Sequence, residues 1–247
     1  MSLEIKNLTG GYAHVAVLKD VSFTANDGEI TGLIGLNGAG KSTTIKHVIG
    51  LLIPQKGEIS VNNMTLKANK DAYHQQIAYV PETPVLYPEL TLREHIDLAI
   101  LAYDLDHDET MAKAMVLLKK FRLDNKLDWF PNNFSKGMKQ KVMIVCAFMT
   151  DAKLFIIDEP FTGLDPLAIH DLLDVVEAKK KAGSAILMST HILATAQQYA
   201  DRFVLLNDGK VRTSGTLDEL KQTFNMSDAN LDDIYLQMTK EAVDNHA

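Results

Sequence analysis

The chain has 247 residues, 46% of which are hydrophobic, and a formal net charge of −7. Its length allows a large buried core, in one domain or in a core with an added lobe. The acidic balance and the absence of a long lysine or arginine tract argue against binding dominated by nucleic-acid phosphates or anionic lipid, because both require concentrated positive charge.

The sequence indicates neither a targeting segment nor a membrane-spanning segment. The N-terminus "MSLEIKNLTG" alternates apolar and polar residues, unlike a signal peptide. No apolar stretch approaches the about 18 to 20 residues of a spanning helix. Cys146, the single cysteine, lies in the apolar run "VMIVCAFM" and is expected to be a small buried hydrophobe. We therefore expect a cytoplasmic protein that reaches a membrane only through another chain.

The first elements along the chain are strands. "EIKNL" and "VLKDVSFTA" are expected to be antiparallel strands, and "EITGLIGL" a buried strand that runs into a glycine-rich turn. After the turn, "KSTTIKHVIG" predicts a helix that ends at Gly50 in a left-handed cap. The order in this part of the chain is strand, loop, helix.

The loop between that strand and that helix, "GLNGAGKST", matches the phosphate-binding pattern G-x-x-x-x-G-K-[ST] in the context that the pattern requires. Its glycines let the backbone N–H groups point at phosphate oxygens, and the helix start adds a field that favours negative charge. Lys41 supplies a charge for the β and γ phosphates, and Ser42 can bind Mg²⁺. The candidate nucleotide contacts are Gly35, Asn37, Gly38, Ala39, Gly40, Lys41, Ser42 and Thr43.

Residues from about 90 to 150 have a helical pattern. "TLREHIDLAILAY" begins with Thr91 and Glu94 at capping-box spacing, and a second helix is expected at "ETMAKAMVLLKKF". Further on, "FSKGMKQ" places Ser135 as a hydroxyl cap and Gly137 in the first turn of a third helix. On their own, these two residues are equally compatible with an ordinary capped helix.

Two short patterns in the same region imitate known sites. "NKLD" at 125–128 resembles the guanine-recognition motif of GTPases, but it follows a helical pattern instead of a buried strand, and no D-x-x-G accompanies it. "DLDHDE" has the acidic spacing of a calcium loop, but Glu109 stands where glycine is required and Met115 where the bidentate glutamate belongs. We interpret both patterns as solvated surface segments.

The next part of the chain has strand, helix, strand order. "KLFIID" and "SAILMST" are candidates for buried parallel strands, and the helix between them has Asp165 as its cap and Gly183 as its stop. The first strand ends at Asp158 and Glu159, which suit Mg²⁺ binding through water and the orientation or deprotonation of an attacking water. His191 follows the second strand, in a position to meet a γ-phosphate.

Five motifs in this order and spacing, "GLNGAGKST", "FSKGMKQ", "LFIIDEP", "TGLDP" and "STH", resemble the nucleotide-binding domain of ABC (ATP-binding cassette) transporters over nearly the whole chain. The resemblance implies that Tyr12 stacks on adenine, with an ordinary turn tyrosine as the alternative. It also implies that Ser135, Gly137 and Asp165 lie at the seam of a dimer, where the helix start at Ser135 covers the nucleotide of a second copy.

Two motifs depart from the commonest pattern of this family. The signature "LSGGQ" is replaced by residues 134–138, which differ at three of five positions and keep the serine and the second glycine. The usual glutamine of the Q-loop is replaced by Glu82, a candidate Mg²⁺ contact beside Ser42 and Asp158. This second departure resembles the ATPases of ABC-2-type and related bacterial exporters.

The segment after Glu82 contains apolar residues that have two possible roles. They are Val85, Leu86, Tyr87 and Leu90. In the family that the chain resembles, the nearby lobe receives a helix from the membrane subunit, so we expect Leu86 and Tyr87 to contact that partner. Packing of the helical lobe onto the core is the alternative.

The expected fold is α/β: a P-loop NTPase core of RecA type, an N-terminal antiparallel β subdomain and an inserted helical lobe. One domain spans 1–247. The core and β subdomain occupy about 1–85 and 151–220, the lobe with the signature occupies about 86–150, and a C-terminal tail occupies 221–247. The expected catalytic residues are Glu159, His191 and Lys41.

The resemblance implies an ATP-binding subunit that hydrolyses Mg²⁺-ATP in a dimer with a second ATPase subunit and drives a separate transmembrane permease from the cytoplasmic face. The alternative is a soluble ABC-type ATPase acting on nucleic acid or the ribosome. That alternative is disfavoured because the chain has no room for a long coiled-coil insertion and contains one cassette instead of two. A simple kinase or GTPase lacks support, and no direct contact with nucleic acid is expected.

Overall fold

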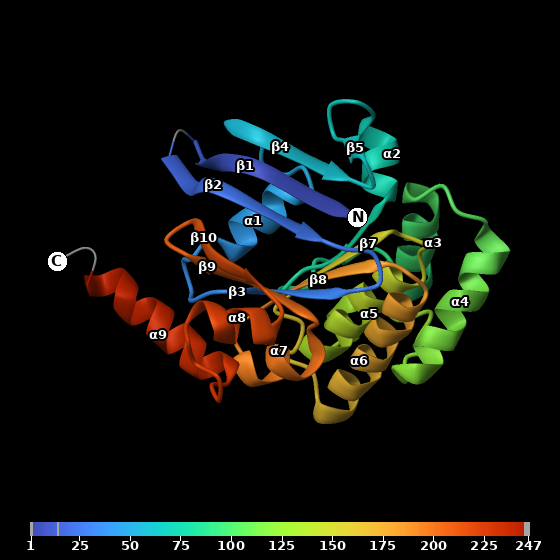
Figure 1. The fold of residues 1–247 in the computed structure, drawn as a ribbon. Helices are drawn as coiled ribbons and strands as arrows, with labels where there is room; N and C mark the ends of the chain where they lie inside the picture. The colour runs from blue at the N-terminus through green and yellow to red at the C-terminus, as the bar shows by residue number, and fades with distance from the viewer. Residues whose placement is uncertain (1, 14, 245–247) are drawn as a thin grey trace.

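The computed structural model describes residues 2–13 and 15–244 as two sheets with helices around them (Figure 1). The smaller sheet is antiparallel, with strand order β2-β1-β4-β5. Its main-chain pairing aligns Leu3 with Ala25 on one side and with Val61 on the other. The strands are β1 (Leu3–Tyr12), β2 (Val15–Ala25), β4 (Lys56–Val61) and β5 (Met64–Thr65).

The larger sheet has the order β10-β9-β3-β8-β7-β6, and all its neighbouring strands are parallel except the β9–β10 hairpin. Every residue of β3, β7 and β8 is buried, as expected of central strands covered on both faces. The strands are β3 (Ile30–Ile34), β6 (Ile77–Val80), β7 (Leu154–Asp158), β8 (Ala185–Thr190), β9 (Arg202–Asn207) and β10 (Lys210–Gly215).

Helix α1 (Lys41–Val48) lies between the two sheets (Figure 1). Its Ile45 and Val48 pack in one apolar cluster with Leu8 and Leu18 of the smaller sheet and Leu33 of the larger one. The helix that begins at the phosphate-binding loop is therefore fixed from both sides.

The helical lobe follows β6, as predicted. It contains α3 (Leu92–Ala102), α4 (His107–Lys120), a short 3₁₀ turn (Pro131–Asn133) and α5 (Lys136–Phe148). The capping box at Thr91 and Glu94 is present. The lobe packs with α6 (Pro166–Lys181) in a single apolar cluster that also contains residues of β6, β7 and β8, so lobe and core share buried surface.

The remaining helices are α2 (Lys70–Gln75), α7 (Leu193–Tyr199), α8 (Leu217–Thr223) and α9 (Leu231–Asp244). The last three lie together on the face of the larger sheet opposite α1 (Figure 1). Leu231, Ile234 and Tyr235 of α9 are buried in a cluster with Ile34 and Phe203, so this helix contributes to the core.

The structure confirms the predicted α/β class, with its antiparallel N-terminal sheet, mostly parallel core and inserted helices. Gly50 and Gly183 have φ of 76° and 92° directly after their helices, as the predicted left-handed caps require. Within residues 2–13 and 15–244, no helix combines the length and the apolar composition needed to cross a bilayer.

Candidate functional site

The loop between β3 and α1 is folded tightly, and its glycines explain how. A Cβ on Gly35 would lie 2.5 Å from the carbonyl oxygen of Leu206, so only glycine fits against β9. Gly38 and Gly40 have φ of 85° and 111°, which other residues rarely adopt. The amide and the hydroxyl of Thr44 both donate to the carbonyl of Gly40, at 2.8 and 3.0 Å, and close the first helical turn. The N–H groups at the start of α1 are left for a ligand.

The side chain of Lys41 is held inside this loop. Its Nζ donates to the carbonyl of Gly35 at 2.8 Å and lies 3.5 Å from Oε1 of Glu159. The side chain is only 7% exposed, so its charge acts in a region partly shielded from water. The cation of the loop and the carboxylate that follows β7 therefore face each other directly.

Glu159 is fixed by contacts on both sides of its carboxylate. Its backbone has φ of 46°, unusual for a residue with a side chain, and its N–H donates to the carbonyl of Ser189 at 3.2 Å and to the Ser189 hydroxyl at 3.1 Å. Oε2 lies 2.8 Å from Nδ1 of His191, which donates, while Oε1 faces Lys41. Backbone strain of this kind is frequent at functional sites.

The Asp158 carboxyl lies beside the Ser42 hydroxyl. Burial raises the pKa of Asp158, and hydrogen bonds from Ser189 and Ser42 partly offset this effect. Carboxylate and hydroxyl oxygens are ligands that Mg²⁺ accepts, with phosphate oxygens and water completing the shell. Among the described residues, no group of three or more His, Cys, Asp or Glu side chains could hold a metal ion alone. The residues present therefore fit a metal that arrives with a phosphate ligand.

A cavity of about 470 Å³ joins these groups. Tyr12, which is 45% exposed, accepts a hydrogen bond from Nζ of Lys46 through its hydroxyl oxygen at 3.1 Å, and this bond lowers the pKa of Tyr12. Of the predicted site residues, the cavity is lined by Tyr12, Asn37, Gly38, Gly40, Lys41, Ser42, Thr43, Glu82, Glu159 and His191, joined by Val17 and Leu36. Gly35, Ala39 and Asp158 lie in the same loop and strand end, behind this lining.

The predicted signature residues form the start of α5. The Ser135 hydroxyl accepts from the N–H of Met138 at 3.3 Å and caps the helix. A Cβ on Gly137 would lie 2.6 Å from the carbonyl oxygen of Gly163, so a larger residue does not fit there without movement. The signature helix and the loop that leads to α6 are thus packed backbone against backbone.

Asp165, in that loop, caps α6 by accepting from the N–H of Ala168 at 2.8 Å and pairs with Lys141 of α5 at 3.0 Å. These two contacts lower the pKa of Asp165. Neither Asp165 nor the signature residues Ser135 and Gly137 are among the described lining of the cavity. The structure therefore separates the predicted site into a group around the cavity and a group at the α5–α6 surface.

Two residues to which the sequence analysis assigned no role hold the site together. Ser189 bonds to Asp158 and to the N–H of Glu159, and its position at the end of a buried strand was a signal that could have found it. Gly209, in the β9–β10 turn, donates to the carbonyl of Ala39 at 3.0 Å and accepts from the N–H of Lys19 at 2.7 Å. A Cβ on Gly209 would lie 1.7 Å from the carbonyl oxygen of Val17, a close approach that no local pattern predicts.

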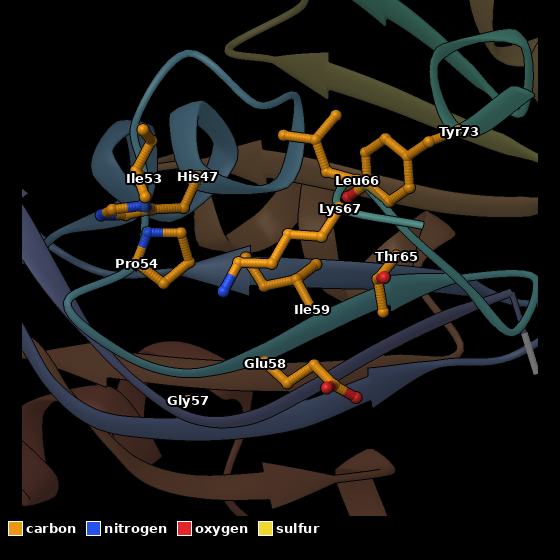
Figure 2. A pocket seen from close by; sticks show the side chains of 10 residues that line it. All are labelled: His47, Ile53, Pro54, Gly57, Glu58, Ile59, Thr65, Leu66, Lys67 and Tyr73. Atoms are coloured by element: carbon orange, nitrogen blue, oxygen red, sulfur yellow. The ribbon is translucent and has the colours of Figure 1, made fainter. Parts of the chain in front are cut away.

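A second cavity, of about 250 Å³, lies away from these residues (Figure 2). Its walls include Ile53, Pro54, Leu66 and Tyr73, and none of the predicted site residues lines it. His47 borders it, and burial lowers the pKa of this histidine. Of these two cavities, the one around Lys41 is therefore the one that contains predicted site residues.

The phosphate-binding loop, the buried helix start and the carboxylates at the end of a neighbouring parallel strand define a P-loop nucleoside triphosphatase. Residues 18–162 match the family model described as ABC transporter. The chain belongs to the ABC transporter family.

Solved and curated relatives agree with this assignment. The chain is 58% identical, over 97% of both chains, to the ABC-type transporter ATP-binding protein EcsA of Bacillus subtilis (strain 168). A structure of an ATP-binding subunit of an ABC transporter is similar with a TM-score of 0.94 and 54% identity, covering 97% of this chain and 100% of that chain. A dimeric ATP-binding cassette in a post-hydrolysis state, bound to ADP and Pi, is similar with a TM-score of 0.77 and 25% identity, covering 87% and 98%.

Proposed function

We propose that this chain is the ATP-binding subunit of an ABC transporter and that it hydrolyses Mg²⁺-ATP in a dimer to drive a separate membrane subunit. One observation carries the proposal: a single cavity brings together the phosphate-binding loop, the carboxylate of Glu159 and His191. The names of the similar proteins, EcsA and the ATP-binding subunit of known structure, support it. None of these relatives supports the alternative of an ATPase that acts on nucleic acid.

The main residues of the cavity have separate roles in this proposal. Tyr12 offers its exposed ring to the adenine, and the N–H groups of the loop and the start of α1 bind the phosphates. Lys41 binds the β and γ phosphates, in exchange for the Glu159 carboxylate that it faces at 3.5 Å. That exchange releases one oxygen of Glu159.

Glu159 is the proposed general base. With Lys41 on the phosphates, its carboxylate is held by His191 alone and can orient and deprotonate the attacking water. His191 also lines the cavity, where its imidazole can reach the γ-phosphate. Mg²⁺, held by Ser42 and Asp158 with Glu82 on the cavity wall, would neutralise charge that develops on the phosphates.

A second copy of the chain is the proposed partner at the cavity. Ser135 and Gly137 place the N-terminus of α5 on the surface, and a helix N-terminus favours negative charge. Asp165 lies beside this helix, at the same surface. In a head-to-tail homodimer each signature helix would cover the γ-phosphate in the other copy, and the solved cassette, which is dimeric, supports the pairing of two copies.

The proposed contact with a permease is an apolar surface near the lobe, on the cytoplasmic side of the membrane. A hollow of about 320 Å³ is lined by residues of α2, β6 and the ends of α1 and α3, which are Ile49, His74, Ile77, Tyr79, Ala102 and Tyr103. Val85 and Tyr87, in the loop between β6 and α3, are exposed. Leu86 differs from our expectation, because it is partly buried against the core cluster of the lobe. It supports packing of the lobe, and the partner contact is assigned to Val85 and Tyr87.

The catalytic assignment can be tested with two substitutions. Glu159→Gln should bind ATP as the wild type does but hydrolyse it about 10² to 10⁴-fold more slowly, the usual loss on removing a general base. Lys41→Ala should weaken nucleotide binding itself. Steady-state ATPase assays and titration with a fluorescent ATP analogue separate the two defects. Wild-type turnover by Glu159→Gln would contradict the assignment.

A further inference from the structure

The C-terminal helix α9 packs with one face against the core beside the phosphate-binding loop. Leu231, Ile234, Tyr235 and Met238 are all buried, and their spacing places them on one face of the helix. They form a cluster with Ile34, the last residue of β3, and with residues of β9 and α7. The helix therefore lies directly behind the point where the loop begins.

One polar contact connects α9 to the loop itself. The N–H of Leu36 donates to the hydroxyl oxygen of Tyr235 at 2.7 Å, across 199 positions of sequence. Tyr235 is 5% exposed and Leu36 is 58% exposed, so the bond is shielded from water on the side of α9 and is partly buried as a whole. The carbonyl of Leu36 accepts from the N–H of Ala39 at 3.0 Å, which closes the turn that leads to Gly40. Both backbone polar groups of Leu36, its N–H and its carbonyl, thus have partners, and Tyr235 is the partner of the N–H.

A second polar contact connects the start of α9 to α7. The N–H of Leu231, which has no partner within its own helix, donates to Oε1 of Gln197 at 2.6 Å. Gln197 belongs to the helix that begins two residues after His191. The same C-terminal helix therefore contacts both the phosphate-binding loop and the helix that follows His191 in the chain.

We propose that α9 is a positioning element of the nucleotide site and that Tyr235 is a positioning residue, which holds the Leu36 peptide in the orientation required by the phosphate-binding turn. The loop binds phosphate through backbone N–H groups, so its affinity depends on the fraction of molecules in which the turn is already formed. Release of the Leu36 N–H lowers that fraction without removing any group that contacts the nucleotide. The inference rests on the nucleotide site proposed above.

The substitution Tyr235→Phe, in the full chain, tests this role because it removes only the hydroxyl and keeps the buried ring. We expect the Kd for Mg²⁺-ADP and for Mg²⁺-ATP to rise about three- to tenfold, the size of one lost hydrogen bond. The KM for ATP should rise by a similar factor, whereas kcat at saturating ATP should stay within about twofold of wild type. Isothermal titration and steady-state kinetics give these values.

Ile234→Val is the matched control. Ile234 is buried in the same cluster and on the same helix face, and this change removes one methylene without touching the loop. It should lower the melting temperature modestly and leave nucleotide affinity unchanged. If Tyr235→Phe likewise lowers the melting temperature but keeps wild-type Kd and KM, α9 has only a structural role and the proposal is wrong.

Lys41→Ala distinguishes failure of this inference from failure of the proposed site. A strong loss of nucleotide affinity in Lys41→Ala, together with unchanged affinity in Tyr235→Phe, overturns the positioning role alone. Unchanged affinity in Lys41→Ala overturns the site assignment and, with it, the inference. Weakened binding in both variants, with normal binding in Ile234→Val, supports the role of Tyr235.

Discussion

At the residue scale, the site places groups in conformations and surroundings that are unfavourable for folding. Glu159 has a left-handed backbone conformation, and Asp158 is buried with an elevated pKa. The opposing contacts are local: Ser189 bonds to both residues, and Lys41 faces the Glu159 carboxylate. Sites of this kind commonly sacrifice stability for chemistry.

Asp158→Asn should show this conflict directly. Because burial raises the pKa of Asp158, the native state disfavours the ionised carboxyl, and above the raised pKa this residue lowers stability. The destabilisation starts to decline as the pH falls through that pKa and is lost below 3.8, the ordinary pKa of the group. Near neutral pH, asparagine should therefore raise the melting temperature by a few °C, on the basis of about 2 to 4 °C per kcal/mol.

The same variant should lose Mg²⁺-dependent ATPase activity. Thermal denaturation of nucleotide-free protein at neutral and mildly acidic pH measures the first effect, and its size should shrink as the pH is lowered. A lower melting temperature than wild type at neutral pH would contradict the prediction. Asp208→Asn serves as a control, because this carboxylate is exposed in the β9–β10 turn.

At the element scale, the loop between β6 and α3 is held in place by a hydrogen bond from a residue of the helical lobe. The His95 side chain of α3 accepts from the N–H of Tyr87 at 2.9 Å through Nε2, and its Nδ1 lies 2.7 Å from the carbonyl of Thr91, to which it donates. These bonds fix the backbone, while the ring of Tyr87 remains 60% exposed. A fixed loop with an exposed aromatic ring is suited to contact with another protein.

Tyr87→Ser should reduce recovery of a membrane protein that co-purifies with this chain by several-fold or more, with unchanged affinity for ATP, because it removes an exposed apolar contact. Leu86→Ala should instead lower the melting temperature, since Leu86 packs against the core cluster. Val116→Ser on α4, where the side chain is 70% exposed, is the control and should change neither. Equal recovery of the partner with Tyr87→Ser and with the control would count against the assigned surface.

The elements that the sequence predicts well are those with strong local signals. The starts of α3 at Thr91 and of α6 at Asp165 could be predicted because the side-chain oxygen of each residue caps the first turn. The ends of α1 at Gly50 and of α6 at Gly183 could be predicted because glycine readily adopts the left-handed conformation after the last turn. Strand β6 has four residues, too few for a periodic pattern to indicate it.

The site shows the same difference between local and distant signals. The motifs identify the groups around the cavity because each contains its own turn or helix start. Gly209 and Tyr235 act through contacts with residues that are distant in sequence, which no local pattern encodes. The partly buried state of Leu86 was missed for the same reason, since the lobe that covers it is formed by later residues.

At the scale of the whole molecule, the chain presents a nucleotide cavity and a signature helix that do not meet within one copy. Two copies arranged head to tail would complete two sites at once. ATP should therefore promote dimers, because its γ-phosphate adds negative charge where the partner's helix start can bind it, and ADP should leave them weak. A coupling free energy of about 1 to 3 kcal/mol is expected for linked sites of this kind.

Glu159→Gln should accumulate the dimer with Mg²⁺-ATP, since the γ-phosphate persists. Light scattering after size-exclusion chromatography, with ATP and with ADP, measures this. Mixing Lys41→Ala chains with Ser135→Arg chains gives a companion test, because in that heterodimer one shared site carries both changes and the other carries none. If Glu159→Gln remains monomeric with saturating ATP, both alone and with its membrane partner, the signature segment "FSKGMKQ" does not bind the nucleotide of a second copy and is only the capped start of a helix.

The contact between Lys41 and Glu159 also bears on how nucleotide reaches the protein. The two opposite charges lie 3.5 Å apart, so together they exert little net attraction on a distant anion. The formal charge of the chain, −7, has the same sign as the nucleotide. Long-range steering therefore contributes little to encounter, and capture depends on short-range contacts formed after random collision. Binding of ATP should therefore depend only weakly on ionic strength through the association rate, because the affinity is set by the contacts formed inside the cavity.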